Sequence, residues 1–344
     1  MNISPLLLAW YQENKRHLPW RETTDAYTIW VSEIILQQTR VAQGMDYFYR
    51  FTQAFPTVKH LAEASETEVL RLWQGLGYYS RARNMHKTAK MIVQYHNGIF
   101  PTQYKAILSL PGIGTYTAAA IASFANNEPY AVVDGNVYRV LSRILGIDAP
   151  IDTTAGKKLF NKLAQEYLDK AEPAQYNQAM MDFGAIQCTP QSPNCDSCPF
   201  AEQCEAYRTH QTDNLPVKSK KITQRKRFFW YLDIWNENYT YLQQRNQKDI
   251  WQGLYEPLLL EESLSIAELF NHPTVKALRG TIVHVSPLYK HVLSHQIIEA
   301  RFAKIHVIQE PALLQSMQKI SDTELSLYPV SRLIDKYRKD LPSK

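Results

Sequence analysis

Apolar residues in the first two thirds of the chain recur at helical spacing. Five of them follow one another at steps of three, four and seven residues, which predicts one continuous helix face: Trp30, Ile34, Val41, Met45 and Phe48. Proline and glycine residues punctuate the segments between such patterns, and no run of alternating apolar and polar residues competes with them. Residues 1–215 are therefore predicted to form an all-helical domain.

The pattern changes after Pro216. Four segments alternate between apolar and polar residues and predict strands: Phe228–Trp235, Tyr239–Gln243, Thr281–Val285 and Ile297–Ile305. Two further segments predict helices: Leu264–Phe270 and Leu313–Ile320. We therefore expect an α+β domain over 229–344, joined to the helical domain by a linker at 216–228.

Composition agrees with two domains and locates the charge. The chain has 344 residues, of which 45% are apolar and 21% charged, which is too long for one ordinary core and excludes a disordered protein. The net charge is +5, and residues 218–227 (KSKKITQRKR) hold six basic residues and no acidic one. Such a strip suits contact with a polyanion, and equally a solvated tether.

A membrane location is not expected. The start of the chain has no basic segment before its short apolar run, and the uncharged stretch 106–127 is interrupted by Pro111, Gly112 and Gly114. We expect a cytoplasmic, nucleoid-associated protein.

Four cysteines are concentrated between residues 188 and 204. Cys188, Cys195, Cys198 and Cys204 have the spacing C-x6-C-x2-C-x5-C. Two disulfides so close together are not expected in a helical chain of this kind, and four thiolates suit either zinc or an iron–sulfur cluster. Because only one C-x2-C pair is present and the other loops are longer, the spacing favours a cluster and leaves zinc open.

The segment LPGIGTYTA at 110–118 predicts a turn between two helices. Gly112 and Gly114 permit backbone conformations that other residues avoid, and Thr115 is the expected cap of the following helix. Exposed amides at a helix N-terminus can bind a phosphate, as in a helix-hairpin-helix DNA-binding module at about 104–125. A plain helix–helix turn is the alternative.

Two acidic residues lie in apolar surroundings. Glu33 is the only charge between Ala26 and Thr39, and Asp134 ends the apolar run PYAVVD. A buried carboxyl has a raised pKa and can act as an acid. The structural alternatives are a helix N-cap for Asp134 and, for Glu33, a buried acid satisfied by a polar neighbour such as Gln37.

These motifs together resemble a known family. LPGIGTYTA, VDGNV at 133–137 and the cysteine spacing resemble the endonuclease III superfamily of helix-hairpin-helix glycosylases. Four further segments are similar to MutY-type adenine DNA glycosylases: PWR at 19–21, SEIILQQTRV at 32–41, GLGYYSRARN at 75–84 and NQAMMDFGAIQC at 177–188. WQGLYEPL at 251–258 and HVLSHQIIEARF at 291–302 resemble the Nudix-like domain by which such proteins recognise 8-oxoguanine.

The resemblance implies a multidomain base-excision repair enzyme. It implies a 4Fe-4S cluster at the four cysteines and excision of adenine mispaired with 8-oxoguanine or guanine in double-stranded DNA, by a protein expected to be a monomer. Glu33 would protonate adenine N7 and Asp134 would stabilise the oxocarbenium-like sugar, with Tyr116 and Asn136 positioning Asp134. Tyr116 stands where bifunctional members have lysine, which implies a monofunctional enzyme.

The resemblance also assigns contacts to DNA and to the excised base. The expected DNA contacts are Gln38, Thr39, Leu76, Tyr78, Gly112, Gly114, Ser294 and His295. Trp20, Arg21 and Gln178 match positions at the adenine pocket. Leu293 replaces the family's phenylalanine before Ser294. The competing hypotheses are a bifunctional pyrimidine-lesion glycosylase with lyase activity and a catalytically silent, cluster-containing DNA-binding protein.

Overall fold

The computed structural model describes residues 2–219, 223–237 and 239–341, and the chain divides into two compact units. Unit 1 comprises residues 1–62 and 87–221, and unit 2 comprises residues 63–86 and 222–344. Residues 220–222 of the expected linker lie outside the described residues.

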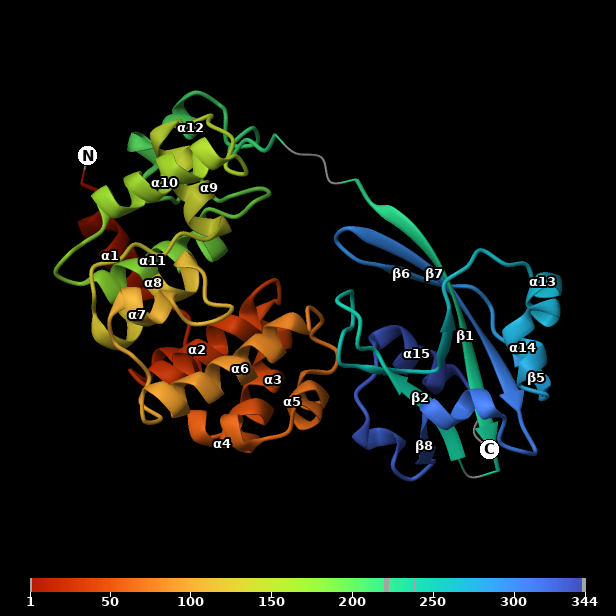
Figure 1. The fold of residues 1–344 in the computed structure, drawn as a ribbon. Helices are drawn as coiled ribbons and strands as arrows, with labels where there is room; N and C mark the ends of the chain where they lie inside the picture. Colours follow the sequence, from red (N-terminus) through yellow and green to blue (C-terminus); the bar gives the residue numbers. More distant parts are fainter. Residues whose placement is uncertain (1, 220–222, 238, 342–344) are drawn as a thin grey trace. The chain divides into compact units, whose positions relative to one another are not determined.

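Unit 1 is built from helices (Figure 1). Its longer helices are α1 (Ser4–Asn14), α2 (Ala26–Leu36), α3 (Val41–Ala54), α8 (Thr115–Asn126), α9 (Gly135–Leu145), α10 (Thr154–Tyr167) and α11 (Pro173–Asp182). The shorter ones are the 3-10 turn η1 (Pro19–Arg21), α7 (Tyr104–Leu108), the π-helix η2 (Phe183–Gln187), the 3-10 turn η3 (Ala201–Gln203) and α12 (Glu205–Arg208). Helices α4 (Val58–Glu63) and α6 (Ser80–Tyr95) each have residues in both units, and α5 (Glu66–Trp73) belongs to unit 2.

The single helix face predicted from Trp30 to Phe48 is wrong, because its positions lie on two helices. Helix α2 ends at Leu36 and α3 begins at Val41. Between them Gln38 has a φ of 58°, in the left-handed region that an α-helix cannot contain. The apolar residues keep their helical spacing across this break, although the backbone there is not helical.

Helix α9 runs through a hydrophobic core of unit 1. Its residues Val137, Val140, Leu141 and Ile144 are buried together with Leu7 and Tyr11 of α1 and Phe160 of α10. Phe183, before the cysteine loop, and Phe200, within it between Cys198 and Cys204, belong to the same cluster and meet at 5.3 Å between ring centroids. The core therefore fixes the start of α9 and the cysteine loop against the same body.

Unit 2 contains a mixed β-sheet with helices on both faces (Figure 1). Its strands are β1 (Arg225–Asn236), β2 (Tyr239–Gln244), β3 (Tyr255–Glu256), β4 (Leu258–Leu260), β5 (Thr281–Val285), β6 (Tyr289–Val292), β7 (Gln296–His306) and β8 (Gln318–Ser321). Strands β1 and β7 pair in parallel from Arg225–Gln296 to Trp235–His306, and both β5 and β6 pair antiparallel with β7.

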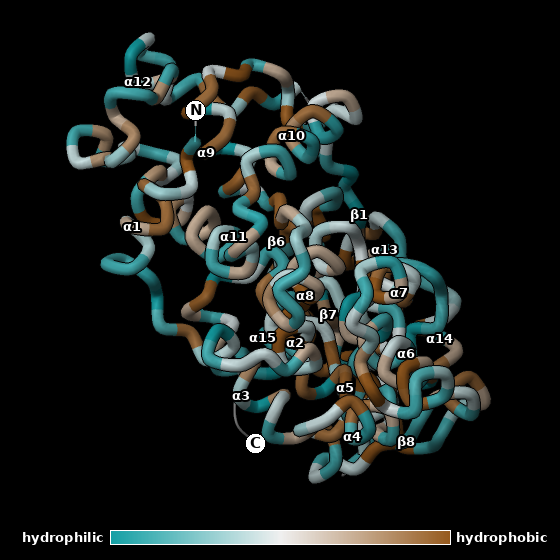
Figure 2. Tube along the Cα trace, turned by 90° about the vertical axis from the view of Figure 1, so that its left-hand side faces the viewer, coloured by the Kyte–Doolittle hydropathy of each residue, from teal (hydrophilic) through white to brown (hydrophobic). Residues whose placement is uncertain are grey.

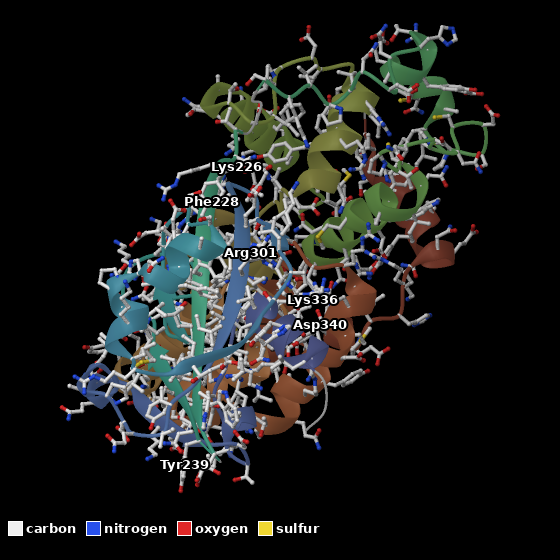
Figure 3. All side chains as sticks on the ribbon, turned by 90° about the vertical axis from the view of Figure 1, so that its right-hand side faces the viewer. Lys226, Phe228, Tyr239, Arg301, Lys336 and Asp340 are labelled. Carbon is white, nitrogen blue, oxygen red and sulfur yellow. The ribbon has the colours of Figure 1, made fainter. Side chains whose placement is uncertain are left out.

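Alternate residues of β1 enter two separate cores. Phe229 and Tyr231 pack with α15 (Arg332–Asp340), whereas Trp230, Leu232 and Ile234 pack with α13 (Ile266–Asn271) and α14 (Pro273–Ala277). This period of two is the geometry of a strand buried on both faces. The residues that α15 presents to solvent include Lys336 and Asp340, labelled in Figure 3.

Residues 63–86 are held to the rest of unit 2 by several contacts. The Val330 N–H donates to Gln74 Oε1 at 3.0 Å, and Arg83 donates to the carbonyl of Gln252. Gly253 has a φ of 85° and lies close to Leu70. A Cβ atom added to Gly253 would come within 3.0 Å of the Leu70 side chain. No pattern in the sequence indicated this association.

Several predicted elements of unit 2 are present, and one is wrong. The segments predicted as strands lie in β1, β2, β5 and β7, and Leu264–Phe270 overlaps α13. Strand β1 begins at Arg225, inside the expected linker, because pairing with β7 starts there. The segment Leu313–Ile320 is not one helix. A 3-10 turn, η4 (Ala312–Ser316), is followed by β8, which pairs with β2 because that sheet edge offers unpaired backbone groups.

In the part of the chain that the structure describes, no helix has the length and apolar character needed to cross a membrane. Figure 2 shows apolar residues in short runs that polar residues interrupt. The uncharged stretch 106–127 is divided between α7 and α8.

Candidate active site and iron–sulfur loop

Helices α7 and α8 are joined by the turn that contains Gly112 and Gly114. Gly112 has a φ of 73°, which explains the glycine, whereas Gly114 has a φ of −94° that any residue can adopt. Gly114 is the N-cap of α8 and Thr115 is its first residue, so the expected cap at Thr115 is wrong. No side chain caps this helix, and a Cβ at Gly114 would meet open space. The first amides of α8 are thus accessible to an external acceptor.

Asp134 is the N-cap of α9 and also lines a cavity. Its Oδ1 accepts hydrogen bonds from the backbone N–H groups of Asn136 (2.8 Å) and Val137 (2.9 Å), and its Oδ2 accepts one from the Asn136 side chain (2.8 Å). Burial raises the pKa of Asp134, and these donors oppose that rise. Asp134 is therefore an N-cap, as one interpretation predicted, and its side chain also lines the cavity.

Glu33 is buried in α2, with 8% of its surface exposed. Burial raises the pKa of this carboxyl to about 7, a hydrogen bond from Tyr116 opposes the rise, and the nearby Asp134 charge adds to it. Burial also raises the pKa of Tyr116 well above its usual value, so the phenol stays neutral and donates. The polar neighbour of Glu33 is thus Tyr116 of α8, and Gln37 donates to Thr117 Oγ1 at 3.3 Å.

Glu33, Tyr116, Asp134 and Asn136 line one cavity of about 590 Å³ in unit 1. The three residues expected at the adenine pocket line the same cavity: Trp20, Arg21 and Gln178. Trp20 is held edge-on against Phe48 at 5.1 Å, and the Gln178 Oε1 accepts the Tyr11 hydroxyl at 2.8 Å. Five separate sequence motifs thus meet around two carboxyl groups.

The cavity also contains residues that sequence reasoning missed. Arg16, Met181 and Arg139 line it, and Asp182 binds Arg16 and Arg21 behind the wall. Asp182 carried a signal that could have found it. It is the only charged residue between Glu172 and Asp196, the same isolation that singled out Glu33 and Asp134.

Gln38 and Thr39 follow α2 in the break before α3. Thr39 lines the cavity, and its N–H donates to the Leu36 carbonyl at 3.1 Å. Gln38, in the left-handed region, is a non-glycine residue in a conformation that costs energy. Such strain is concentrated at functional sites.

Tyr78, in unit 2, is the second non-glycine residue among the expected DNA contacts with a left-handed backbone, with a φ of 48° directly after Gly77. The residue is 46% exposed, and its hydroxyl hydrogen-bonds Ser294. Leu76, Tyr78, Ser294 and His295 line a cavity of about 540 Å³ within unit 2, together with Leu293. The structure therefore brings together these four expected contacts, which come from two distant parts of the sequence.

The four cysteines surround one cavity in the loop that follows η2. Within the described ranges, no three His, Cys, Asp or Glu side chains are placed to hold a single metal ion. Burial raises the pKa of Cys198 to about 11 and also raises those of Cys195 and Cys204. Four clustered thiolates therefore require the positive charge of a bound metal group.

Two arginines on successive turns of α9 join this loop to the cavity. Arg143 donates to Cys188 Sγ at 3.4 Å and to the Thr189 carbonyl at 2.7 Å. Arg139 donates to the Cys188 carbonyl at 2.7 Å and to Asn136 Oδ1 at 2.8 Å. The cysteine loop thus helps to orient the residue that holds Asp134.

Comparisons with known proteins agree with this geometry. Residues 31–167 match the family model described as HhH-GPD superfamily base excision DNA repair protein, and residues 188–204 match the iron–sulfur binding domain of endonuclease III. The chain is 39% identical over 255 residues to an adenine DNA glycosylase of Buchnera aphidicola subsp. Acyrthosiphon pisum, covering 74% of this chain and 73% of that protein. It is 35% identical over 293 residues to the enzyme of Buchnera aphidicola subsp. Baizongia pistaciae, covering 84% and 82%.

The chain belongs to the adenine DNA glycosylases. A human adenine DNA glycosylase is 44% identical over 219 residues, which cover 61% of this chain and 40% of that protein. Among solved structures, a thermostable thymine-DNA glycosylase matches with a TM-score of 0.56 and 28% identity, over 60% of this chain and 94% of the other. An endonuclease III–DNA complex, at 23% identity and a TM-score of 0.52, shares the fold over 60% of this chain and 96% of the other.

Membership confirms several expectations. The protein is a DNA glycosylase of base excision repair with a helix-hairpin-helix glycosylase domain. It has a 4Fe-4S binding domain of the endonuclease III type, and Cys188, Cys195, Cys198 and Cys204 lie in this region. The alternatives of zinc and of a silent DNA-binding protein are thereby excluded. The C-terminal region is an α/β region with a mixed sheet.

Proposed function

We propose that this adenine DNA glycosylase removes adenine that is mispaired with 8-oxoguanine or guanine in double-stranded DNA. The observation that carries the proposal is the meeting of Glu33 and Asp134 in one cavity of about 590 Å³, a volume sufficient for a purine base. The target nucleotide must leave the base stack to enter such a cavity.

The two carboxyl groups have different environments, which suits them to different roles. Glu33 has a pKa of about 7 because it is buried, so a large fraction is protonated at neutral pH and can protonate adenine N7. The bond between the sugar C1′ and adenine N9 then breaks, and its electron pair goes to the protonated base. Asp134 accepts three hydrogen bonds, which favour its ionised form while Glu33 is protonated. Its negative charge stabilises the oxocarbenium-like sugar, to which water adds at C1′.

The remaining residues of the cavity orient the groups that react. Tyr116 donates to Glu33, and Asn136 donates to Asp134. Trp20 provides an apolar wall for a planar base, and Arg21 and Gln178 provide hydrogen-bonding groups for its edge. Asn136 is oriented in turn by Arg139, whose other contact is the carbonyl of the cluster ligand Cys188. A bound cluster would hold this loop, and with it the Cys188 carbonyl, in place; no chemical step passes through it.

We infer that the enzyme is monofunctional. A lyase needs an amine that forms a Schiff base with the sugar. Among the described residues that line the cavity none is a lysine, and position 116 carries a phenol hydrogen-bonded to Glu33. Strand cleavage that accompanies base release in equal amount, without alkali or heat, would contradict this inference.

For DNA contact we propose three groups of residues. The open first turn of α8, after Gly112 and Gly114, suits a backbone phosphate because no side chain occupies its amides. Gln38 and Tyr78 have strained backbones on exposed or half-exposed turns, which suits residues that fill the space left by a flipped base. Thr39, beside Gln38, would contact the same duplex. Of the described basic residues at 218–227, the exposed Lys218, Arg225 and Lys226 would contact phosphates as well. Arg227 is buried and paired with Asp249 and Glu261, so it is not part of this surface.

The C-terminal region is proposed to be a Nudix-like domain that recognises 8-oxoguanine. Its cavity of about 540 Å³ combines Leu76 and Tyr78 with Ser294 and His295. The Ser294 hydroxyl and the His295 ring supply polar groups, while Leu293 and Leu76 supply apolar surface. Leu293 lacks the aromatic ring of the family's phenylalanine, and Tyr78, whose hydroxyl hydrogen-bonds Ser294, is an aromatic group in contact with this loop.

Single-turnover release of adenine tests the proposal. A duplex with one 8-oxoguanine:adenine pair should lose adenine, and the same duplex with 8-oxoguanine:cytosine should lose no base. Glu33→Gln should reduce the rate constant by at least about a thousandfold, the scale of a lost general acid. Ser123→Ala, a buried hydroxyl that binds Asn177 outside the cavity, is the matched control. Undiminished release by Glu33→Gln would refute the assignment.

A further inference from the structure

Asp182 binds two arginines at once behind the wall of the catalytic cavity. It is the last residue of α11, directly before the π-helix η2, and its side chain is fully buried. Arg21 approaches as a fork, with Nη1 at 2.6 Å from Oδ2 and Nη2 at 2.8 Å from Oδ1. Arg16 donates from Nε to Oδ1 at 2.7 Å and from its backbone N–H to Oδ2 at 3.1 Å.

The two guanidinium groups that Asp182 binds lie in the wall of the cavity that holds Glu33. The side chain of Arg21 is 10% exposed and that of Arg16 is 31% exposed, so solvent does little to screen Arg21. The charged and titratable groups that face Glu33 are Arg21 from η1, Tyr116 from α8 and Asp134 at the start of α9. Within the group of Arg16, Arg21 and Asp182, Arg21 is thus the residue whose charge acts directly on Glu33. Asp182 and Arg16 would act on Glu33 through the position and charge balance of that wall.

We propose that Asp182 is a positioning residue for the glycosylase reaction, which fixes Arg16 and Arg21 in the cavity wall and offsets one of their two positive charges so that Glu33 keeps its proton. The inference rests on the proposed role of Glu33 as the general acid. Two arginines and one aspartate carry one net positive charge. Without the aspartate charge the same wall would carry two, and a nearby positive charge favours the ionised form of a carboxyl.

The geometry explains why one carboxylate serves two arginines. A bidentate guanidinium–carboxylate pair fixes the plane of Arg21, and a free guanidinium could otherwise turn to Glu33 or Asp134 and form an ion pair there. Such an ion pair would remove the proton that adenine N7 needs. Asp182 thus keeps Arg21 available to a neutral base and away from the general acid.

The pH profile of single-turnover adenine release tests the inference, with the full-length protein and its cluster in place. In the wild type the rate should fall as the pH rises through the titration of Glu33, and it should fall at low pH as Asp134 becomes protonated. Asp182→Asn should move both the rise and the fall of the pH profile to lower pH by about one unit. At a pH above the midpoint of the Glu33 titration, this shift lowers the rate constant for adenine release by about tenfold. The rate at the optimum should stay within about threefold of the wild-type value.

Three further variants separate charge from packing. Asp182→Glu keeps the charge, so its midpoints should stay at the wild-type values even if its rate falls. Arg16→Gln removes one guanidinium and should move the midpoints to higher pH, the opposite direction; it also keeps the proposal testable if Asp182→Asn does not fold. Asp169→Asn makes the same charge change at a residue bound to Ser4, outside the cavity lining, and should move neither limb.

The outcomes are distinct. Opposite shifts for Asp182→Asn and Arg16→Gln support the inference. If Asp182→Asn lowers the rate equally at every pH and leaves the midpoints of the pH profile unchanged, Asp182 serves the stability of the fold alone. That result would overturn the inference. If the wild type releases no adenine at any pH, the proposed function fails instead.

Discussion

Asp134 accepts hydrogen bonds from both the backbone N–H and the side-chain amide of Asn136, each at 2.8 Å. The first bond caps helix α9, and the second binds the other carboxylate oxygen. The residue that begins the helix is thus the residue proposed to stabilise the sugar cation. Because the capping bonds and the side-chain bond use different oxygen atoms of Asp134, one substitution can remove the second without the first.

Asn136→Ala should impair catalysis more than stability. The backbone bonds that cap α9 remain, and the loss of one side-chain hydrogen bond is expected to cost about 1 kcal/mol of unfolding free energy. Asp134 loses the donor to Oδ2, so its pKa rises and its charge is less available to the sugar. We expect single-turnover adenine release to fall by about tenfold to a hundredfold, most strongly at low pH. Equal loss at every pH would point to misplacement of Asp134 without a change in its ionisation.

Glu33 should make activity depend on pH near neutrality. The rate constant should be level just below the Glu33 pKa of about 7 and should fall about tenfold per pH unit above it, because only the protonated carboxyl donates. A rate that is constant from about pH 6 to about pH 9 would contradict this assignment. The measurement is single-turnover adenine release in buffers of constant ionic strength.

Glu33 should also destabilise the fold at alkaline pH. Its folded pKa of about 7 lies above the unfolded value of 4.5, so stability declines as the pH rises from 4.5 to about 7 and stays low above that. Glu33→Gln removes this penalty and should raise the unfolding free energy at about pH 8 by roughly 2–3 kcal/mol. Chemical denaturation of both proteins at about pH 8 and about pH 5 tests this, with little difference expected at the lower pH.

Tyr78 and Ser294 should act as a coupled pair in unit 2. The tyrosine hydroxyl bonds Ser294, and both line the cavity proposed for 8-oxoguanine. Tyr78→Phe and Ser294→Ala should each reduce the preference for 8-oxoguanine:adenine over guanine:adenine duplexes, and the double variant should show no additional loss, since each removes the same bond. Additive effects in the double-mutant cycle would show that the two residues act independently. Tyr95→Phe, an exposed tyrosine outside this cavity, is the control.

Removal of the cluster should affect both the loop and Asp134. Without bound metal the four cysteines lose their shared partner, and Arg143 and Arg139 lose the ordered loop acceptors near Cys188. Cys198→Ser should lower iron content and the midpoint of thermal unfolding, and adenine release should fall with the remaining cluster content. Arg139→Lys, which keeps the charge but not the fork, should retain iron and still slow adenine release. Full activity of iron-free protein would exclude this link.

The sequence alone determined which residues could carry the chemistry. Isolated acids in apolar runs indicated Glu33 and Asp134, and the cysteine spacing indicated a metal site and favoured a cluster over zinc, because both signals are local in the chain. Asp182 is likewise an isolated acid, but the sequence did not show what it binds, since Arg16 and Arg21 are more than 160 residues away along the chain. Helical and strand periodicity located the elements, although it continued across the break at Gln38.

The tertiary structure decided which of these residues meet and in what state. The pKa of Glu33 depends on burial by helices from other parts of the chain, and no sequence pattern gives the degree of burial. Strand β8 forms because an edge of β2 is unpaired, and Tyr78 reaches Ser294 because residues 63–86 pack with the C-terminal region. Residue types and their spacing can be read from the sequence. Burial of a charge, the charge balance around it and the pairing of strands arise only when distant segments fold against one another.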